Sequence, residues 1–151
     1  RKVALKHVVI VCTVFPGYIA NIGRYLLQDC PGTTLSYNPE FIAQGDIVNG
    51  FFKCDMVLIG EGSKEAGDKL EEIYRATVNS SPTYCRMAPE SAEITKLGVN
   101  CFVTTKISFA NMVGDIANRT PGANAREILM AIGADSRVGR KYLMPGWGYG
   151  G

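Results

Sequence analysis

The pattern of apolar and polar residues divides the chain into two halves with different periods. In the first half, four short apolar runs have the composition of β-strands: residues 8–14, 33–38, 56–60 and 83–87. The first of these runs is largely β-branched, which is typical of a strand buried on both faces. Apolar residues at helical spacing predict helices over 18–29 and 63–78, the second with Ser63 as its N-cap. This succession predicts an α/β layer with a largely parallel sheet.

The second half has a helical period. Pro89 suits the first turn of a helix, no further proline occurs before Asn118, and apolar or small residues recur every three or four positions between them. The pattern predicts one helix of about 28–30 residues, roughly 40–45 Å long. Because so small a chain cannot cover so long a helix, we expect a second copy of the chain to pack along it. A shorter helix over 123–132 and a glycine-rich segment follow.

The composition indicates a globular chain that binds neither nucleic acid nor a membrane. Hydrophobic residues make up 46% of the sequence and charged residues 20%, which suits a globular protein with a buried core. The net charge of +2 is spread over interleaved acids and bases, so we expect no nucleic-acid partner. The longest wholly apolar run, residues 8–11, is far shorter than the roughly 18–20 residues that cross a bilayer. We therefore expect no membrane span, and we see no secretory signal.

Cysteine and histidine usage limits the chemistry further. The five cysteines are scattered and never form a C-x-x-C pair, so we expect reduced thiols and a cytoplasmic protein. His7 is the only histidine, which excludes a site built from several histidines, and we expect no metal ion.

Two polar residues lie at the ends of predicted strands, where α/β sheets bind ligands. The proline of Asn38-Pro39-Glu40-Phe41 keeps Asn38 extended, so Glu40 is presented at the carboxyl end of its strand. Thr13 ends the first strand, at an equivalent edge position, where its hydroxyl would bind a water or a cofactor. The ordinary alternatives are a solvated glutamate and a threonine that caps a strand.

Lys96 and Asn100 are four residues apart in the long predicted helix and therefore share one face. An ammonium and an amide on one face offer two donors to a single oxygen atom, as stabilisation of an oxyanion requires. Glu93 lies one turn earlier, and a solvated ion pair between Glu93 and Lys96 is the alternative.

The segment from Pro145 to Gly151 holds four glycines and two aromatic residues. Glycine lets backbone amides approach a ligand closely, and aromatic rings stack on sugars or bases. The segment is neither a Walker loop nor a dinucleotide fingerprint, because no Gly-Lys-Ser/Thr follows it and no strand precedes it. A flexible tail is the alternative.

Four groups of residues together resemble the UDP-glucose/GDP-mannose dehydrogenase family. They are Thr13-Val14-Phe15-Pro16-Gly17; Tyr37-Asn38-Pro39-Glu40-Phe41; Ala92-Glu93-Ile94 with Lys96, Leu97 and Asn100; and Ser136-Arg137-Val138-Gly139 with Tyr142, Leu143 and residues 145–151. The glycine-rich end looks most like the UDP-glucose 6-dehydrogenase branch. The resemblance implies the C-terminal portion of a Rossmann-like parallel-sheet domain over 1–88. An all-α long-helix dimerisation domain over 89–151, ending in a substrate loop, would follow.

The activity that the resemblance implies is an NAD-dependent oxidation of C6 of UDP-glucose to UDP-glucuronate in two hydride transfers. The aldehyde stage is held on a cysteine as a thiohemiacetal, oxidised to a thioester and then hydrolysed. By position, Lys96 and Asn100 would stabilise charge on the oxygen at C6. Glu40 would act as acid and base in the hydrolysis, with Thr13 orienting the water. A homodimer through helix 89–118 and a UDP-sugar substrate are the implied partners.

The remaining site residues are also assigned by position in the family. The substrate contacts correspond to Phe41, Ile42, Ala43, Gln44, Arg137, Tyr142, Gly146, Gly148, Tyr149 and Gly150, and the cofactor contacts to Thr13 and Gln44. Arg137 matches an arginine that reaches the substrate of the neighbouring subunit. Gln44 departs from the usual glutamate, and its amide cannot accept a proton. Cys12 replaces the family serine and is not the nucleophile by position.

Both ends of the chain resemble interior points of a longer protein. The sequence begins without methionine at Arg1, and the family's Gly-x-Gly-x-x-Gly unit and its Gly-Gly-Ser-Cys nucleophile do not occur within it. We therefore expect a central fragment without turnover of its own. The alternatives are a non-catalytic module that dimerises or binds a sugar nucleotide, a GDP-mannose 6-dehydrogenase, and a dehydrogenase of the 6-phosphogluconate type.

Overall fold

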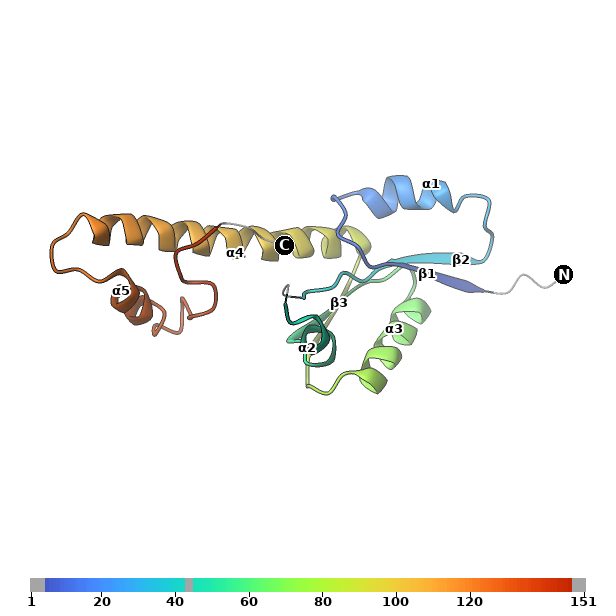
Figure 1. Ribbon diagram of the computed structural model, residues 1–151. Helices are drawn as coiled ribbons and strands as arrows, with labels where there is room; N and C mark the ends of the chain where they lie inside the picture. The colour runs from blue at the N-terminus through green and yellow to red at the C-terminus, as the bar shows by residue number, and fades with distance from the viewer. Residues whose placement is uncertain (1–4, 43–44, 148–151) are drawn as a thin grey trace. The chain divides into compact units, whose positions relative to one another are not determined.

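The computed structural model describes residues 5–42 and 45–147 (Figure 1). The chain divides into two compact units, Arg1–Leu97 and Gly98–Gly151, and the division falls within one long helix. The domain boundary predicted between residues 88 and 89 stays a prediction. Over the described ranges, no helix has both the length and the apolar character needed to cross a membrane.

The described part of the first unit is built on a four-stranded sheet with the strand order β1-β2-β3-β4. The strands are β1 Lys6–Ile10, β2 Thr33–Tyr37, β3 Met56–Gly60 and β4 Thr83–Met87. β1 pairs with β2 and β3 pairs with β4 in parallel, whereas β2 and β3 pair antiparallel through Tyr37 and Gly60. The predicted mixed α/β architecture is confirmed, and the sheet is parallel within each outer pair but not across its middle.

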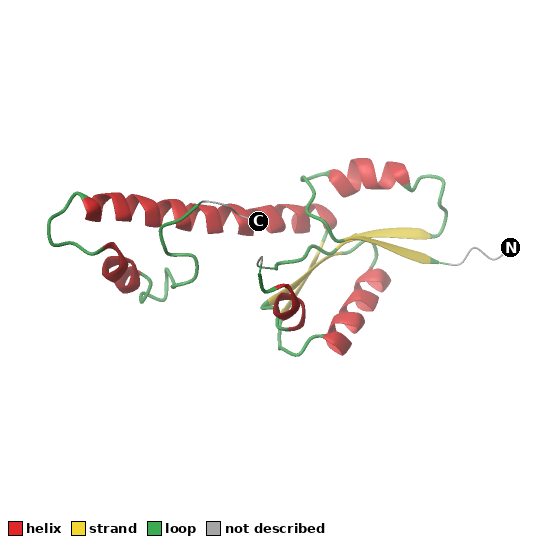
Figure 2. Cartoon of the chain, viewed as in Figure 1, coloured by secondary structure: helices red, strands yellow, loops and turns green. Residues whose placement is uncertain are grey.

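Helical segments pack on both sides of this sheet (Figures 1 and 2). One side carries the π-helix η1 Ile19–Gly23 and the adjoining α1 Arg24–Leu26, and the other carries α2 Ile47–Phe52 and α3 Lys64–Thr77. Ser63 caps α3 as predicted, because its hydroxyl oxygen accepts a hydrogen bond from the amide of Ala66 at 3.1 Å.

The strand predicted over 8–14 is wrong in extent and in burial. β1 ends at Ile10, and its first three residues are exposed. The physical reason is its place in the sheet, because β1 is the first strand in the order and pairs with β2 alone among the described strands. The β-branched run therefore indicates a β-strand correctly, but it does not indicate that both faces of that strand are buried.

The helix predicted over 18–29 is also shorter than expected and irregular. It consists of a π-helical turn followed by one short α-helical turn, and Ile22 and Leu26 of its expected apolar face are 50% and 66% exposed. Ile19 alone of these three is buried. α2 was not predicted, because six residues that include Gly50 are too few to show a helical period.

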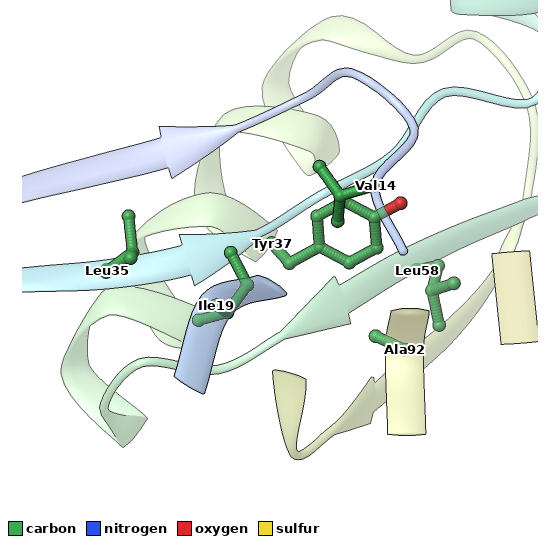
Figure 3. Close-up of a cluster of buried hydrophobic side chains, with 6 residues drawn as sticks. All are labelled: Val14, Ile19, Leu35, Tyr37, Leu58 and Ala92. Carbon is green, nitrogen blue, oxygen red and sulfur yellow. The ribbon is translucent and has the colours of Figure 1, made fainter. Parts of the chain in front are cut away.

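The core of the first unit gathers around Tyr37, which has no exposed surface (Figure 3). The buried side chains that complete this cluster are Val14, Ile19, Leu35, Leu58 and Ala92. They come from the segment after β1, from η1, β2 and β3, and from the long helix α4, Pro89–Asn118. Burial raises the pKa of the Tyr37 phenol. A single apolar cluster thus fixes the start of α4 against the sheet.

Asn38 fixes the segment that leaves β2. Its buried side-chain amide donates to the carbonyl of Leu58 in β3 and accepts from the hydroxyl of Tyr74 in α3, both at 2.8 Å. Its backbone N–H donates to the carbonyl of Ile10, at the end of β1, at 2.9 Å. Asn38 therefore joins three strands and one helix immediately before Pro39 and Glu40.

An ion-pair network ties β4 to the start of α3. The Arg86 guanidinium contacts the carboxylates of Glu61, Asp68 and Glu71. These carboxylates, Glu61 most strongly, raise the pKa of Arg86. The pKa of Asp68 is lowered first by Lys64 and then by Arg86, and the pKa of Glu71 is lowered first by Arg75 and then by Arg86. The network therefore holds α3 against β4.

The second unit contains the rest of α4 and α5, Ala125–Ile132. The predicted bounds of α4 are confirmed at both ends, and α5 begins two residues later than predicted. Ala110 of α4, Leu129 of α5 and Leu143 form the buried core of this unit. Both helices of the second unit therefore share one apolar contact.

The chain that follows α5 is held along α4 by polar contacts. The Lys106 ammonium donates to the carbonyls of Val138 and Gly139, at 3.0 and 3.1 Å. The Asn111 side chain both donates to and accepts from the backbone of Gly146, at 2.8 Å each. The start of the glycine-rich segment is thus attached to the same helix that carries Asn100.

We predict that Gly62→Ala lowers the free energy of unfolding by about 1–3 kcal/mol. A Cβ at Gly62 would lie 2.1 Å from the carbonyl oxygen of Leu35, so the backbone of β2 would have to shift. Gly98→Ala, inside α4, is the matched control, because its Cβ meets nothing within 4 Å. The control should gain about 1 kcal/mol. Urea unfolding measures both variants, and an unchanged stability of Gly62→Ala would contradict the close approach.

We predict that Tyr74→Phe costs about 1–2 kcal/mol of stability, because it leaves the buried side-chain oxygen of Asn38 without its donor. Tyr25→Phe is the control, since Tyr25 is 66% exposed. Thermal unfolding of the two variants in parallel checks this, and equal melting temperatures would rule out a stabilising role for the bond to Asn38.

Candidate active site

Lys96 is a buried charged residue beside the predicted site. It is 7% exposed, and its ammonium donates to the backbone carbonyl of Glu40 at 2.6 Å. The ammonium also lies 4.5 Å from the centre of the Phe41 ring, within the range of a cation–π contact. Burial lowers the pKa of Lys96, and the charge of Glu40 partly opposes that shift. The helix α4 therefore holds the Glu40–Phe41 segment through Lys96.

A lysine ammonium carries three N–H donors, and the carbonyl of Glu40 uses one of them. A second acceptor at this ammonium would meet a charge that is already partly desolvated, where electrostatic attraction is stronger than in water. The geometry therefore suits a lysine that fixes a loop and also stabilises a negative oxygen atom.

Glu93 does not form the solvated pair with Lys96 that was the alternative reading of this helix. Glu93 has no exposed surface, and its carboxylate accepts hydrogen bonds from the backbone amides of Gly17 and Ile19, at 2.5 and 2.8 Å. The reason is the packing of α4 against η1, which brings together residues more than 70 positions apart. Spacing along the helix carried no signal of this contact.

Thr13 and Glu40 leave the sheet at the same edge. Thr13 follows β1 and is exposed, whereas its neighbour Val14 is buried in the core. The bond from Asn38 to Ile10 joins the carboxyl end of β1 to the start of the segment that contains Glu40. The two residues therefore come from adjacent parallel strands, as their positions after predicted strands implied.

A small cavity lies behind the Glu40 segment. Its volume is about 20 Å³, and its lining includes Asn38, Pro39, Phe41, Ile42 and Tyr74. A space of this size holds about one water molecule. Phe41 and Ile42, both assigned to the substrate, are half-buried and line this packed interior.

The predicted site residues of the second unit lie on α4 and in the chain after α5. Asn100 is partly buried, and its backbone carbonyl accepts from the hydroxyl of Thr104. Arg137 is exposed and pairs with Asp135 at 2.7 Å, which raises the pKa of Arg137 and lowers that of Asp135. That pairing was not predicted, although the two residues are only two positions apart.

Tyr142 and Gly146 complete the described part of the predicted substrate loop. Tyr142 is 52% exposed, with a φ of 61° in the left-handed region that L-residues rarely adopt. Gly146 is fixed by Asn111. The other assigned residues, Ala43, Gln44, Gly148, Tyr149 and Gly150, lie outside the described residues. Within residues 5–42 and 45–147, no group of three or more His, Cys, Asp or Glu side chains is arranged so that it could bind a metal ion.

Comparison with known proteins accounts for both halves of the chain. Residues 2–78 match the NAD binding domain of the UDP-glucose/GDP-mannose dehydrogenase family, and residues 90–151 match the central domain of the same family. NAD is therefore the cofactor of the domain to which the first half belongs.

Individual relatives agree with the family models. A UDP-glucose 6-dehydrogenase of Rickettsia prowazekii is 33% identical over 144 residues, covering 95% of this chain and 33% of the relative. A GDP-mannose 6-dehydrogenase of Pseudomonas aeruginosa is 34% identical over 160 aligned positions, covering 100% of this chain and 36% of the relative. The chain thus spans about a third of the length of these relatives.

Solved structures show the same fold. A UDP-glucose dehydrogenase from Pyrobaculum islandicum superposes with a TM-score of 0.82 at 34% identity, covering 91% of this chain and 32% of that one. A ternary complex of GDP-mannose dehydrogenase from Pseudomonas aeruginosa superposes with a TM-score of 0.83 at 32% identity, covering 97% of this chain and 34% of that one. The chain belongs to the UDP-glucose/GDP-mannose dehydrogenase family.

Proposed function

We propose that the protein containing this chain oxidises C6 of UDP-glucose to UDP-glucuronate, with NAD as the oxidant in two successive hydride transfers. The observation that carries this proposal is the buried Lys96 ammonium bound to the backbone of Glu40. It brings a desolvated cation and the segment of a carboxylate together at the ligand-binding edge of an α/β sheet. That combination suits chemistry in which an oxygen atom gains negative charge.

Lys96 and Asn100 stabilise the oxygen at C6 as the first hydride leaves. Both belong to α4, and their spacing of four residues corresponds to about one helical turn. An ammonium and a side-chain amide supply donors without the need for solvent to reorganise during the reaction.

Glu40 and Thr13 serve the hydrolytic half of the reaction. The resulting aldehyde forms a thiohemiacetal on a cysteine, which is oxidised to a thioester and then hydrolysed. None of the five cysteines in this chain lies in a Gly-Gly-Ser-Cys context, so none of them is assigned as the nucleophile. Glu40 accepts a proton from the attacking water, which the Thr13 hydroxyl orients. The exposure of Thr13 at the edge where Glu40 also emerges supports this division of roles.

NAD, when bound, accepts the hydride from C6. Thr13 fits a place beside it, because an exposed hydroxyl after β1 can donate to or accept from a polar cofactor group. Gln44, the other residue assigned to the cofactor, lies outside the described residues. Its neutral amide allows hydrogen bonding but no proton transfer.

The choice between UDP-glucose and GDP-mannose as the substrate depends on the sequence of the glycine-rich segment. The UDP-glucose and GDP-mannose relatives are almost equally similar to this chain, at 33% and 34% identity. The ending Pro145-Gly146-Trp147-Gly148 with Tyr149-Gly150-Gly151 favours UDP-glucose, and GDP-mannose is the second candidate.

A homodimer through α4 is the assembly that we propose. Within the second unit, four large apolar side chains of this helix are 40–65% exposed: Phe102, Phe109, Met112 and Ile116. Their spacing of seven, three and four residues places them in one stripe along the helix. A stripe of this kind on a long helix suits contact with its own copy about a twofold axis.

We predict that the full-length protein releases two NADH per UDP-glucose and that Lys96→Ala lowers kcat by about 10²–10³-fold, the usual loss for one oxyanion donor. Lys69→Ala is the control, because Lys69 pairs with Glu72 on the exposed side of α3. NADH absorbance measures both. The isolated 151-residue chain should give no turnover, and an enzyme-proportional rate from it would refute that part of the proposal.

We predict that Phe109→Glu converts the dimer to a monomer, because a carboxylate in the middle of an apolar helix contact would have to be desolvated without a partner. Ile73→Glu is the control, since Ile73 is 55% exposed on α3 of the first unit and is not part of the stripe. Sedimentation equilibrium distinguishes the two states. A Phe109→Glu variant that stays dimeric would exclude the stripe as the interface.

A further inference from the structure

Glu93 is a buried carboxylate to which the proposed reaction gives no role. It has no exposed surface, and a charge placed there without partners would be strongly unfavourable. Its two oxygens are satisfied by the backbone amides of Gly17 and Ile19. Since both donors are main-chain groups, Glu93 recognises the path of that segment rather than any of its side chains.

The segment that Glu93 holds is the one that carries Thr13. On one side of Thr13, the carbonyl of Ile10 is bonded to Asn38. On the other side, Val14 is buried in the core, and Gly17, with a φ of +87°, turns the chain into η1. Local hydrogen bonds from Tyr18 to Phe15 and from Asn21 to Gly17 shape this second side, and the bonds from Glu93 join it to α4.

Glu93 and Lys96 together connect α4 to both strand ends. The two side chains are three residues apart in the helix, so they lie close to one another on its surface. Glu93 binds the backbone that follows Thr13, and Lys96 binds the backbone of Glu40. The first turns of α4 therefore set where Thr13 stands relative to Glu40.

From this geometry we infer that Glu93 is a positioning residue for the hydrolytic half of the reaction, acting through the Thr13 segment. The inference rests on the proposed function. In the hydrolytic step, a water oxygen bonds to the thioester carbonyl carbon, and one water proton passes to Glu40. The carbon–sulfur bond then breaks, and the products are a carboxylic acid, a cysteine thiolate and a protonated Glu40. A displaced Thr13 slows this step more than the hydride transfers, because Thr13 orients the attacking water but only contacts the cofactor.

The test is Glu93→Gln in the full-length protein, followed by rapid mixing with NAD and UDP-glucose. Glutamine keeps one acceptor oxygen but turns an NH₂ group toward the second backbone amide. We expect a burst of two NADH per site at a rate within about twofold of the unaltered protein, then a steady-state rate about tenfold lower. A tenfold change corresponds to about 1.4 kcal/mol in the barrier. The KM for UDP-glucose should change less than twofold.

Two further variants separate positioning from general support. Glu93→Asp keeps two acceptor oxygens and the charge, so it should recover part of the lost rate. Glu90→Gln removes an acid from the first turn of the same helix and should leave both phases unchanged. Hydrogen exchange of a peptide covering residues 12–22 should become faster in Glu93→Gln alone among these variants.

Each outcome bears on the inference. A loss of burst and steady-state rate in proportion, with a lower melting temperature, would make Glu93 a general structural support and overturn the assigned role. An unchanged steady state and unchanged exchange would overturn it as well. If the unaltered protein released no NADH from UDP-glucose or GDP-mannose, the proposed function itself would fail, together with the role built on it. Activity in the unaltered protein therefore distinguishes the two failures.

Discussion

The first unit depends on how two buried charges at the start of α4 are satisfied. A carboxylate and an ammonium removed from water are unfavourable unless each finds partners. Glu93 finds two backbone amides near η1, and Lys96 finds a backbone carbonyl after β2. Neither charge pairs mainly with the other, so each holds a different loop. These bonds consequently fix the segments that follow β1 and β2, together with η1, to the start of α4. The Tyr37 cluster packs among the same elements.

Elements whose cause is local were predictable from the sequence. Ser63 before an amphipathic run marks the start of α3, and the proline-free stretch after Pro89 marks α4; both agree with the structure. The strands β3 and β4 are likewise bounded as their apolar runs implied. The segment after β1 was not predictable in the same way, because its form follows from contacts with Glu93 and from its place at the sheet edge. Tertiary contacts decided the conformation there, and propensity did not.

The sequence proposed the members of the candidate site, whereas the hydrogen bonds between them became visible only in the structure. Family resemblance picked out Lys96 and Glu40, and strand–turn spacing placed Glu40 at the correct edge. The bond between them joins residues 56 positions apart, and no period or motif encodes it. Asn38 was seen as an extended residue before a proline, whereas the structure makes it the junction of β1, β3 and α3. Such junctions arise only once the sheet exists, which is why a one-dimensional pattern does not contain them.

The anchoring of both loops through main-chain atoms has an evolutionary consequence. Side chains of α4 bind the N–H groups of residues 17 and 19 and the carbonyl of residue 40. Every amino acid offers a backbone carbonyl, and every one except proline offers a backbone N–H group. Side chains in these loops can therefore change during divergence while the frame that presents them is retained. A substitution of Glu93 or Lys96 would remove these contacts, whereas substitution of a loop side chain by any residue other than proline would leave them in place.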